Sequence, residues 1–111
     1  MTDARSLETL ARLAATIAAR KSADAATSYT ARLLADPELA ARKLGEEAVE
    51  TVVAALSGDT GALTAEAADL VYHLLALLGA RGVTLADVAA ELERREGLSG
   101  LAEKAARGKG A

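Results

Sequence analysis

The sequence contains no cysteine, tryptophan or phenylalanine, and it has one proline and two aromatic residues, Tyr29 and Tyr72. The absence of cysteine excludes disulfides, thiolate metal ligands and thiol nucleophiles. Few β-branched runs are available to build a sheet, whereas 29 of the 111 residues are alanine, the best helix former. We therefore predict an all-α protein, a bundle of about five helices.

The chain also lacks an excess of positive charge. Its net charge is −3 and its pI is near 5.1, so we expect no nucleic acid partner. Residues 1–12 contain no apolar core of a signal peptide, and His73 interrupts the longest apolar stretch, Leu70–Ala80. These features predict a cytoplasmic protein without a membrane partner. A chain this short buries a modest share of its surface alone, which favours a homodimer that completes a four-helix-type core.

Apolar periodicity, capping residues and glycines predict where the helices lie. The five predicted helices are one ending near residue 20 or 21, one beginning near 28, and those over 37–57, 60–78 and 84–96. The predicted N-caps are Ser28, Asp36, Thr60 or Thr64, and Thr84. We expect one domain over residues 1–96 and a flexible, locally basic tail over 97–111, to which we assign no function.

Four carboxylates stand in two helix-spaced pairs within the most apolar stretches of the chain. The pairs are Glu47 with Glu50 and Glu66 with Asp69. Residues three apart on a helix project from the same face, so each pair can direct its oxygens at one point. Burying like charges costs roughly several kcal/mol per ion unless cations neutralise them. The two pairs therefore predict a divalent metal site.

The composition narrows the chemistry of such a site. Carboxylate oxygens without thiolate or histidine partners suit hard cations, Mg²⁺ first and Mn²⁺ as a substitute. A single histidine, His73, cannot supply the Glu-x-x-His pairs of a di-iron bundle. The sequence shows no strained serine or cysteine nucleophile motif. The chemistry still compatible with the composition is metal-assisted attack of water on a phosphoanhydride substrate.

The alternative interpretation of the acids is a charged face in contact with solvent. It fits Glu47 and Glu50 better than Glu66 and Asp69, because the second pair is surrounded by alanine, leucine and valine. A helical wheel also places Lys43, with Glu46, on the same face as the first pair. A purely structural metal site needs neither a phosphate-pairing cation nor a spare acid.

Three segments carry a resemblance to a known family. They are Ser28–Leu33 (SYTARL), Lys43–Glu50 (KLGEEAVE) and Glu66–His73 (EAADLVYH). Together they resemble the phosphoribosyl-ATP pyrophosphohydrolases, which belong to the all-α, MazG-like nucleoside triphosphate pyrophosphohydrolases with an ExxE and an ExxD motif. The resemblance extends from about Leu7 to Arg95. The ExxE and ExxD motifs alone would indicate only the superfamily.

The resemblance implies Mg²⁺-dependent hydrolysis of 1-(5-phospho-β-D-ribosyl)-ATP to the corresponding AMP and pyrophosphate, the second step of L-histidine biosynthesis, by a homodimer. It implies that the metal ligands are Glu47, Glu50, Glu66 and Asp69 and that the catalytic residues are Glu46, Glu47 and Glu50. Glu46 would be an outer ligand or a water-orienting base, and Lys43 would contact a phosphate. No cyclohydrolase domain precedes this one, as it does in fused versions, so we expect the next step on another chain.

Several residues keep two interpretations. His73 is either a core histidine or a contact to substrate or to a ligating carboxylate. Tyr29 and Tyr72 are core anchors or platforms for adenine, and Ser28 is a helix cap or a phosphate contact. The basic residues that either bind the 5-phosphate or complement helix dipoles are Arg20, Lys21 and Arg32.

Two other functions stay open at this point. The first is a house-cleaning pyrophosphohydrolase of the same superfamily that acts on canonical or damaged (d)NTPs. The second is a non-catalytic helical dimerisation module whose acids bind a structural metal or face solvent.

Overall fold

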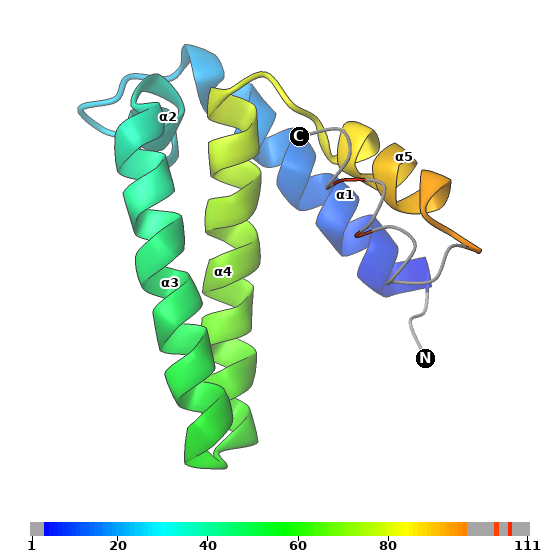
Figure 1. Ribbon diagram of the computed structural model, residues 1–111. Helices are drawn as coiled ribbons and strands as arrows, with labels where there is room; N and C mark the ends of the chain where they lie inside the picture. Colours follow the sequence, from blue (N-terminus) through cyan, green and yellow to red (C-terminus); the bar gives the residue numbers. More distant parts are fainter. Residues whose placement is uncertain (1–3, 98–103, 105–106, 108–111) are drawn as a thin grey trace.

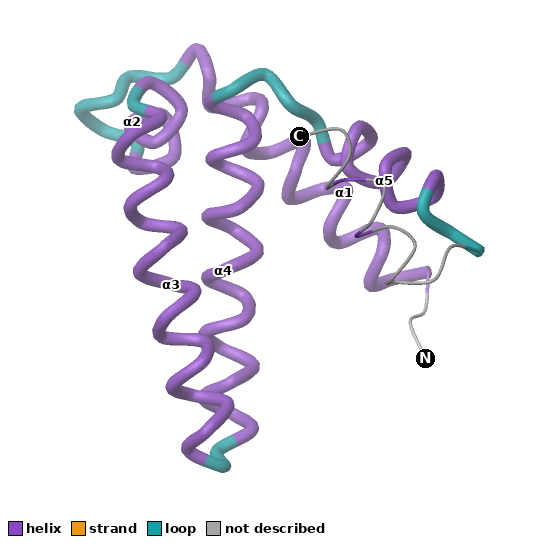
Figure 2. The backbone as a smooth tube through the Cα atoms, in the orientation of Figure 1, coloured by secondary structure: helices purple, strands orange, loops and turns teal. Residues whose placement is uncertain are grey.

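The computed structural model describes residues 4–97, 104 and 107, and within them it contains helices and loops but no strand (Figure 2). The helices are α1 (Ala4–Ala19), the 3₁₀-helix η1 (Arg20–Ser22), α2 (Tyr29–Ala35), α3 (Pro37–Ser57), α4 (Thr60–Ala80) and α5 (Leu85–Arg94). The all-α prediction with five helices is confirmed. Most of the predicted tail, at 98–103, 105–106 and 108–111, lies outside the described residues.

Helices α3 and α4 form a long antiparallel hairpin, and each has 21 residues (Figure 1). The predicted bounds of α3 are confirmed: Asp36 accepts a hydrogen bond from the Leu39 backbone N–H, and Pro37 occupies the first turn. The helix ends at Gly58, whose φ of 84° lies in the left-handed region that favours glycine.

The predicted cap of α4 is wrong. The N-cap is Asp59 rather than Thr60 or Thr64, and its Oδ1 accepts hydrogen bonds from the backbone N–H groups of Gly61 at 2.9 Å and Ala62 at 3.1 Å. A carboxylate at this position satisfies two free N–H groups and complements the positive end of the helix dipole. The helix therefore begins immediately after the turn that ends α3.

Helix α2 packs against both long helices at the end of the hairpin far from the α3–α4 turn (Figure 1). The predicted Ser28 cap is confirmed, since its Oγ accepts a hydrogen bond from the Ala31 N–H at 3.1 Å. The centre of the core lies here, where Leu33, Ala40 and Ala76 are buried. This packing fixes the start of α2 beside α3 and α4.

Helix α1 contacts α4 through its C-terminal half, where Ile17 is buried, and its N-terminal half extends away from the hairpin near α5 (Figure 1). The predicted Thr84 cap of α5 is confirmed, and Thr84 forms a capping box with Asp87. Leu92 on α5 would be expected to point inward from its apolar spacing with Val88, but this side chain is 60% exposed. Helix α5 lies beside α1 (Figure 1), and Ala86 and Ala89 line a pocket together with Ala11 and Ala14 of α1.

Helix α4 is, in the described part of the chain, the one helix long and apolar enough to cross a membrane by length and composition, with a mean hydropathy of 1.3. The helix reaches this hydropathy although Glu66 and Asp69 lie within it, because alanines and leucines fill most of its other positions. In this fold α4 is the central helix: it contacts α1, α2 and α3. It also carries Glu66 and Asp69 within its length.

Candidate metal centre

Carboxylates from the two long helices meet across the α3–α4 hairpin. Glu47 on α3 and Glu66 and Asp69 on α4 each contribute an oxygen to a group whose members lie within 4.8 Å of one another. The pairing follows from the antiparallel hairpin, which places position 47 of α3 beside position 66 of α4. Three of the four predicted metal ligands therefore surround one point.

The environment of two of these carboxylates is unusual for acids. Glu47 and Glu66 each place one oxygen, Oε2, out of contact with solvent, and neither atom has a hydrogen-bond partner among the described residues. A buried carboxylate oxygen without a partner is costly, since it loses its water and gains nothing in return. A hard cation between the two helices would supply the missing interaction, so the residues present fit such an ion.

The electrostatics agree with this geometry. Burial raises the pKa of Glu47, and the adjoining carboxyl of Glu50 and the charges of Asp69 and Glu66 raise it further. Burial is also the largest cause of the raised pKa of Glu66, followed by Glu50 and Asp69. Glu50, the fourth predicted ligand, is exposed, and it raises the pKa of both half-buried acids, Glu47 and Glu66. The carboxylates of the cluster thus repel one another, and a bound cation would relieve this repulsion.

A hydroxyl group lies beneath the cluster. Thr51 Oγ1 is 2.7 Å from the carbonyl oxygen of Glu47 on its own helix and 3.2 Å from the carbonyl oxygen of Glu66 on α4. Sequence reasoning missed this residue. The available signal was its spacing, because a threonine four residues after a ligand can bond back to that ligand's carbonyl.

The other two polar residues predicted on α3 form an ion pair at the edge of the cluster. Lys43 Nζ lies 3.5 Å from a carboxylate oxygen of Glu46, and both side chains are largely exposed. Burial raises the pKa of the Tyr29 hydroxyl, Lys43 lowers it, and Glu46 and Glu47 are among the groups that raise it. The start of α2 therefore lies within electrostatic reach of the acidic face of α3.

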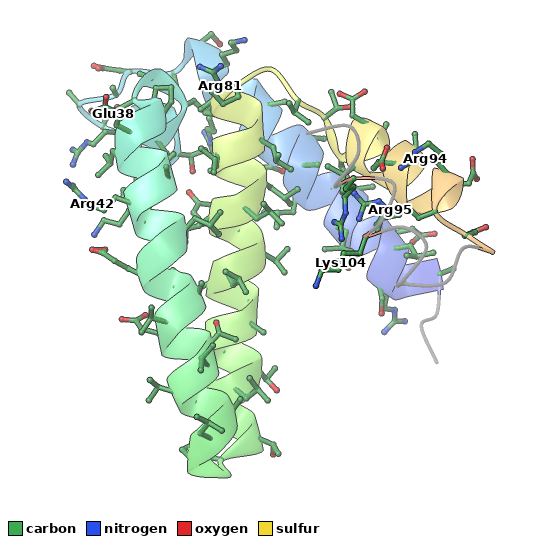
Figure 3. The ribbon with its side chains drawn as sticks, in the orientation of Figure 1. Glu38, Arg42, Arg81, Arg94, Arg95 and Lys104 are labelled. Atoms are coloured by element: carbon green, nitrogen blue, oxygen red, sulfur yellow. The ribbon has the colours of Figure 1, made fainter. Side chains whose placement is uncertain are left out.

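Figure 3 labels charged residues of α3, α4 and α5 that are not members of the cluster. Glu38 and Arg42 project from the side of α3 away from α4 (Figure 3). Arg81 is the C-cap of α4, Arg94 is the last residue of α5, and Arg95 is the C-cap of α5 (Figure 3). None of these five residues belongs to the carboxylate group at positions 47, 66 and 69.

His73 is buried, and both of its ring nitrogens have partners. Nδ1 lies 2.8 Å from the carbonyl oxygen of Asp69, and Nε2 lies 3.0 Å from the hydroxyl of Tyr29. A carbonyl only accepts, so Nδ1 carries the proton and Nε2 of the neutral ring accepts from Tyr29. His73 thus contacts the backbone of a predicted metal ligand rather than its carboxylate.

A second side-chain bond joins the same two helices, between the hydroxyls of Thr30 and Tyr72. The rings of Tyr29 and Tyr72 stack at 6.5 Å, and His73 meets Tyr72 edge-on at 5.0 Å. Tyr72 packs against the buried core, whereas Tyr29 keeps 44% of its surface exposed.

An apolar cavity of about 320 Å³ lies elsewhere, between α1, α4 and the start of α5. Its lining includes Ile17, Leu75 and Leu85 and none of the carboxylates of the cluster. The candidate site is therefore an open face of the α3–α4 hairpin, bordered by the first turn of α2.

Comparison with known proteins agrees with the geometry. Residues 10–96 match the family described as phosphoribosyl-ATP pyrophosphohydrolase. A phosphoribosyl-ATP pyrophosphatase of Caulobacter vibrioides is 63% identical over 103 residues, which cover 93% of this chain and 96% of the relative. Those of Dinoroseobacter shibae and Parvibaculum lavamentivorans are 62% and 65% identical, covering 91% and 89% of this chain and 100% and 92% of the relatives. The chain belongs to the phosphoribosyl-ATP pyrophosphohydrolase family.

Proposed function

We propose that the protein hydrolyses 1-(5-phospho-β-D-ribosyl)-ATP (phosphoribosyl-ATP) to phosphoribosyl-AMP and pyrophosphate in the cytoplasm, as the second step of L-histidine biosynthesis. The observation that carries the proposal is the pair of buried, unpartnered oxygens of Glu47 and Glu66, which face each other across the hairpin. Family membership over residues 10–96 and the names of the relatives support the substrate.

The cofactor we propose is Mg²⁺, with Mn²⁺ as a substitute. The ligands are the four acids Glu47, Glu50, Glu66 and Asp69, whose oxygens are those that hard cations prefer. When bound, the metal lowers the pKa of a coordinated water and screens the negative charge of the phosphates. Three of the four acids already meet at one point, which supports this ligand set.

The ion pair of Lys43 and Glu46 at the edge of the cluster suggests which residue binds the substrate phosphate and which accepts the proton of the attacking water. In hydrolysis, the oxygen of one water forms a bond to phosphorus, and the bond from phosphorus to the α–β bridging oxygen breaks. We assign the water proton to Glu46, which is exposed next to the acids, and the phosphate oxygens to Lys43. Substrate phosphate would replace Glu46 as the partner of Lys43, and this exchange frees the carboxylate to act as a base.

The first turn of α2 provides the remaining substrate contacts in this proposal. Ser28 accepts the Ala31 N–H through its oxygen, so its own proton stays available for a phosphate. Tyr29 offers its exposed ring edge to the nucleotide. His73 reaches substrate only if Tyr29 releases Nε2; otherwise it orients Tyr29.

Pyrophosphate release from phosphoribosyl-ATP, measured with and without Mg²⁺ beside a panel of dNTPs, tests this function. We expect Mg²⁺-dependent release that is fastest with phosphoribosyl-ATP. Faster release from a dNTP would indicate a house-cleaning enzyme. No release from any nucleotide would indicate a non-catalytic dimerisation module.

We also propose a homodimer, based on a stripe of exposed apolar residues on α3. The stripe has helical spacing of three and four and consists of Val49, Val52, Val53 and Leu56, which are 64%, 59%, 62% and 83% exposed. A second copy placed against the stripe would bury it.

Light scattering coupled to size-exclusion chromatography tests the dimer. We expect Val53→Lys to shift the mass from dimer to monomer, because it places a charge in the middle of the stripe. The control is Leu92→Lys, which adds the same charge at an equally exposed residue of α5 outside the stripe. A monomeric wild-type protein would contradict the proposal.

A further inference from the structure

Thr51 joins the two helices of the metal centre at the level of the buried acids. We propose that it is a positioning residue: its hydroxyl sets the spacing of α3 and α4 where Glu47 and Glu66 present their oxygens. This inference rests on the proposed function, because it concerns how tightly the same site holds its cation. Thr51 touches the main chain of the two acids and neither the metal nor the substrate.

The two hydrogen bonds of Thr51 differ in kind. The bond to the Glu47 carbonyl, four residues earlier, is local and common for a helical threonine. The bond to the Glu66 carbonyl crosses to the other helix, 15 residues away in sequence. The hydroxyl has one proton and shares it between two acceptors, so it holds both carbonyl oxygens at a short distance from one atom.

The position of this link coincides with the place of greatest electrostatic strain. Glu47 and Glu66 carry the unpartnered buried oxygens, and the neighbouring carboxylates Glu50 and Asp69 raise the pKa of both acids. Repulsion between these acids acts to separate the helices in the absence of a cation. A hydrogen bond between the helices directly below them opposes that separation.

Apolar packing cannot easily replace this link. The buried residues of α3 are two alanines, Ala40 and Ala54, so no large side chain of α3 is buried between them beside the acids. Mg²⁺ requires near-ideal geometry at about 2.0–2.1 Å, and a site held loosely by about 1 Å loses function. A small change in helix spacing should therefore appear first as weaker metal binding.

Three variants separate the hydroxyl from the size and the helix position of the threonine. Thr51→Val keeps the shape and removes the hydroxyl, while Thr51→Ser keeps the hydroxyl. The matched control is Thr64→Val, since Thr64 donates to the Thr60 carbonyl at 2.8 Å on α4 and is exposed. All three change one helical residue and leave every acid in place.

The probe is Mn²⁺ alone, and the readout is its dissociation constant from the electron paramagnetic resonance signal of the free ion, with urea unfolding in parallel. We expect Thr51→Val to weaken Mn²⁺ binding by about tenfold or more, the usual effect of losing a partner that orients a ligand. Thr51→Ser and Thr64→Val should bind Mn²⁺ like the wild type. In turnover, Thr51→Val should need more Mg²⁺ for half-saturation and recover its kcat when Mg²⁺ is saturating.

Three results would overturn the inference. Wild-type Mn²⁺ affinity in Thr51→Val would do so even if the variant unfolded more easily, because the role would then be structural only. Equal weakening in Thr51→Ser would show that the hydroxyl is not responsible. Failure of the wild-type protein to bind Mn²⁺ would reject the proposed metal centre itself, and the wild-type titration alone identifies that case.

Discussion

The hydroxyl of Tyr29 donates a hydrogen bond of 3.0 Å to Nε2 of His73, a residue 44 positions later in the sequence. The bond joins the first turn of α2 to the middle of α4. Because Nδ1 of the same ring bonds to the Asp69 carbonyl, the contact connects the substrate side of the proposed site to the backbone of a proposed ligand. Together with the bond between Thr30 and Tyr72, this hydrogen bond helps to hold α2 beside the helix that carries Glu66 and Asp69.

Removing this hydroxyl should be costly although Tyr29 is partly exposed. Tyr29→Phe leaves Nε2 of the buried His73 without its donor, and we expect a loss of about 1–2 kcal/mol of unfolding free energy. Urea unfolding measures it. Thr9→Val is the control, since it removes an exposed hydroxyl that bonds only locally. Equal stability of Tyr29→Phe and the wild type would show that the bond contributes nothing.

The corrected cap of α4 leads to a second prediction. Asp59→Ala removes the acceptor for two backbone N–H groups and should lower the unfolding free energy by about 1 kcal/mol. Thr60→Ala, at the next position, should change it by less than about 0.5 kcal/mol, as surface substitutions generally do. Thermal unfolding monitored by circular dichroism compares the two. A larger effect of Thr60→Ala would restore the cap that the sequence suggested.

The raised pKa values of Glu47 and Glu66 predict how metal binding depends on pH. Protons compete with the cation for these carboxylates, and a raised pKa brings that competition closer to neutral pH. Mn²⁺ affinity should therefore fall as the pH is lowered toward the ordinary carboxyl pKa near 4.5. In metal-free protein the sign is opposite: the folded state binds protons more tightly than the unfolded chain, so its stability should rise as pH falls through the same range.

Calorimetric titration of Mn²⁺ at a series of pH values, with thermal unfolding of the metal-free protein, checks both signs. Glu47→Gln removes one of the two groups and should flatten the stability profile of the metal-free protein. Mn²⁺ affinity that stays constant across the range would mean that neither acid binds the ion.

Helix α5 predicts a pH effect away from the site. Glu91 bonds to Arg94 at 2.7 Å and to Arg95 at 2.9 Å, and these bonds lower its pKa to about 2. The stabilisation is present above the ordinary carboxyl pKa near 4.5 and is lost as the pH falls from there toward 2. The gap in melting temperature between the wild type and Glu91→Gln should therefore close between pH 5 and about pH 2. Added salt should also narrow it, because the pair is near the surface.

The sequence predicts the fold well because the helix signals are local. Asp36 with Pro37, Ser28 and Thr84 each satisfy backbone groups within three residues, so spacing alone identifies them. The cap of α4 was misassigned because an aspartate and two threonines compete over six residues. The 60% exposure of Leu92 could not be predicted from the sequence, because periodicity shows that a helix has an apolar face but not whether another element packs on that face.

The proximity of the acids could also be predicted from the sequence, because a short turn between two helices places them antiparallel and brings the two helix-spaced pairs close together. The roles of Thr51 and His73 could not be predicted in the same way, because these roles depend on contacts between helices. Thr51 reaches a backbone carbonyl of α4, and His73 receives a hydroxyl from α2. Neither contact leaves a periodic or spacing signal in one sequence.

The most direct test of the account is steady-state pyrophosphate release from phosphoribosyl-ATP at saturating Mg²⁺ by the wild-type protein and by Glu66→Gln. The substitution keeps the size of the side chain and removes the charge of a half-buried carboxylate, one oxygen of which is buried without a hydrogen-bond partner. The account predicts rapid release by the wild type and a loss of turnover of about 10²-fold or more in the variant, with unchanged helicity. Wild-type turnover by a folded Glu66→Gln protein would contradict it.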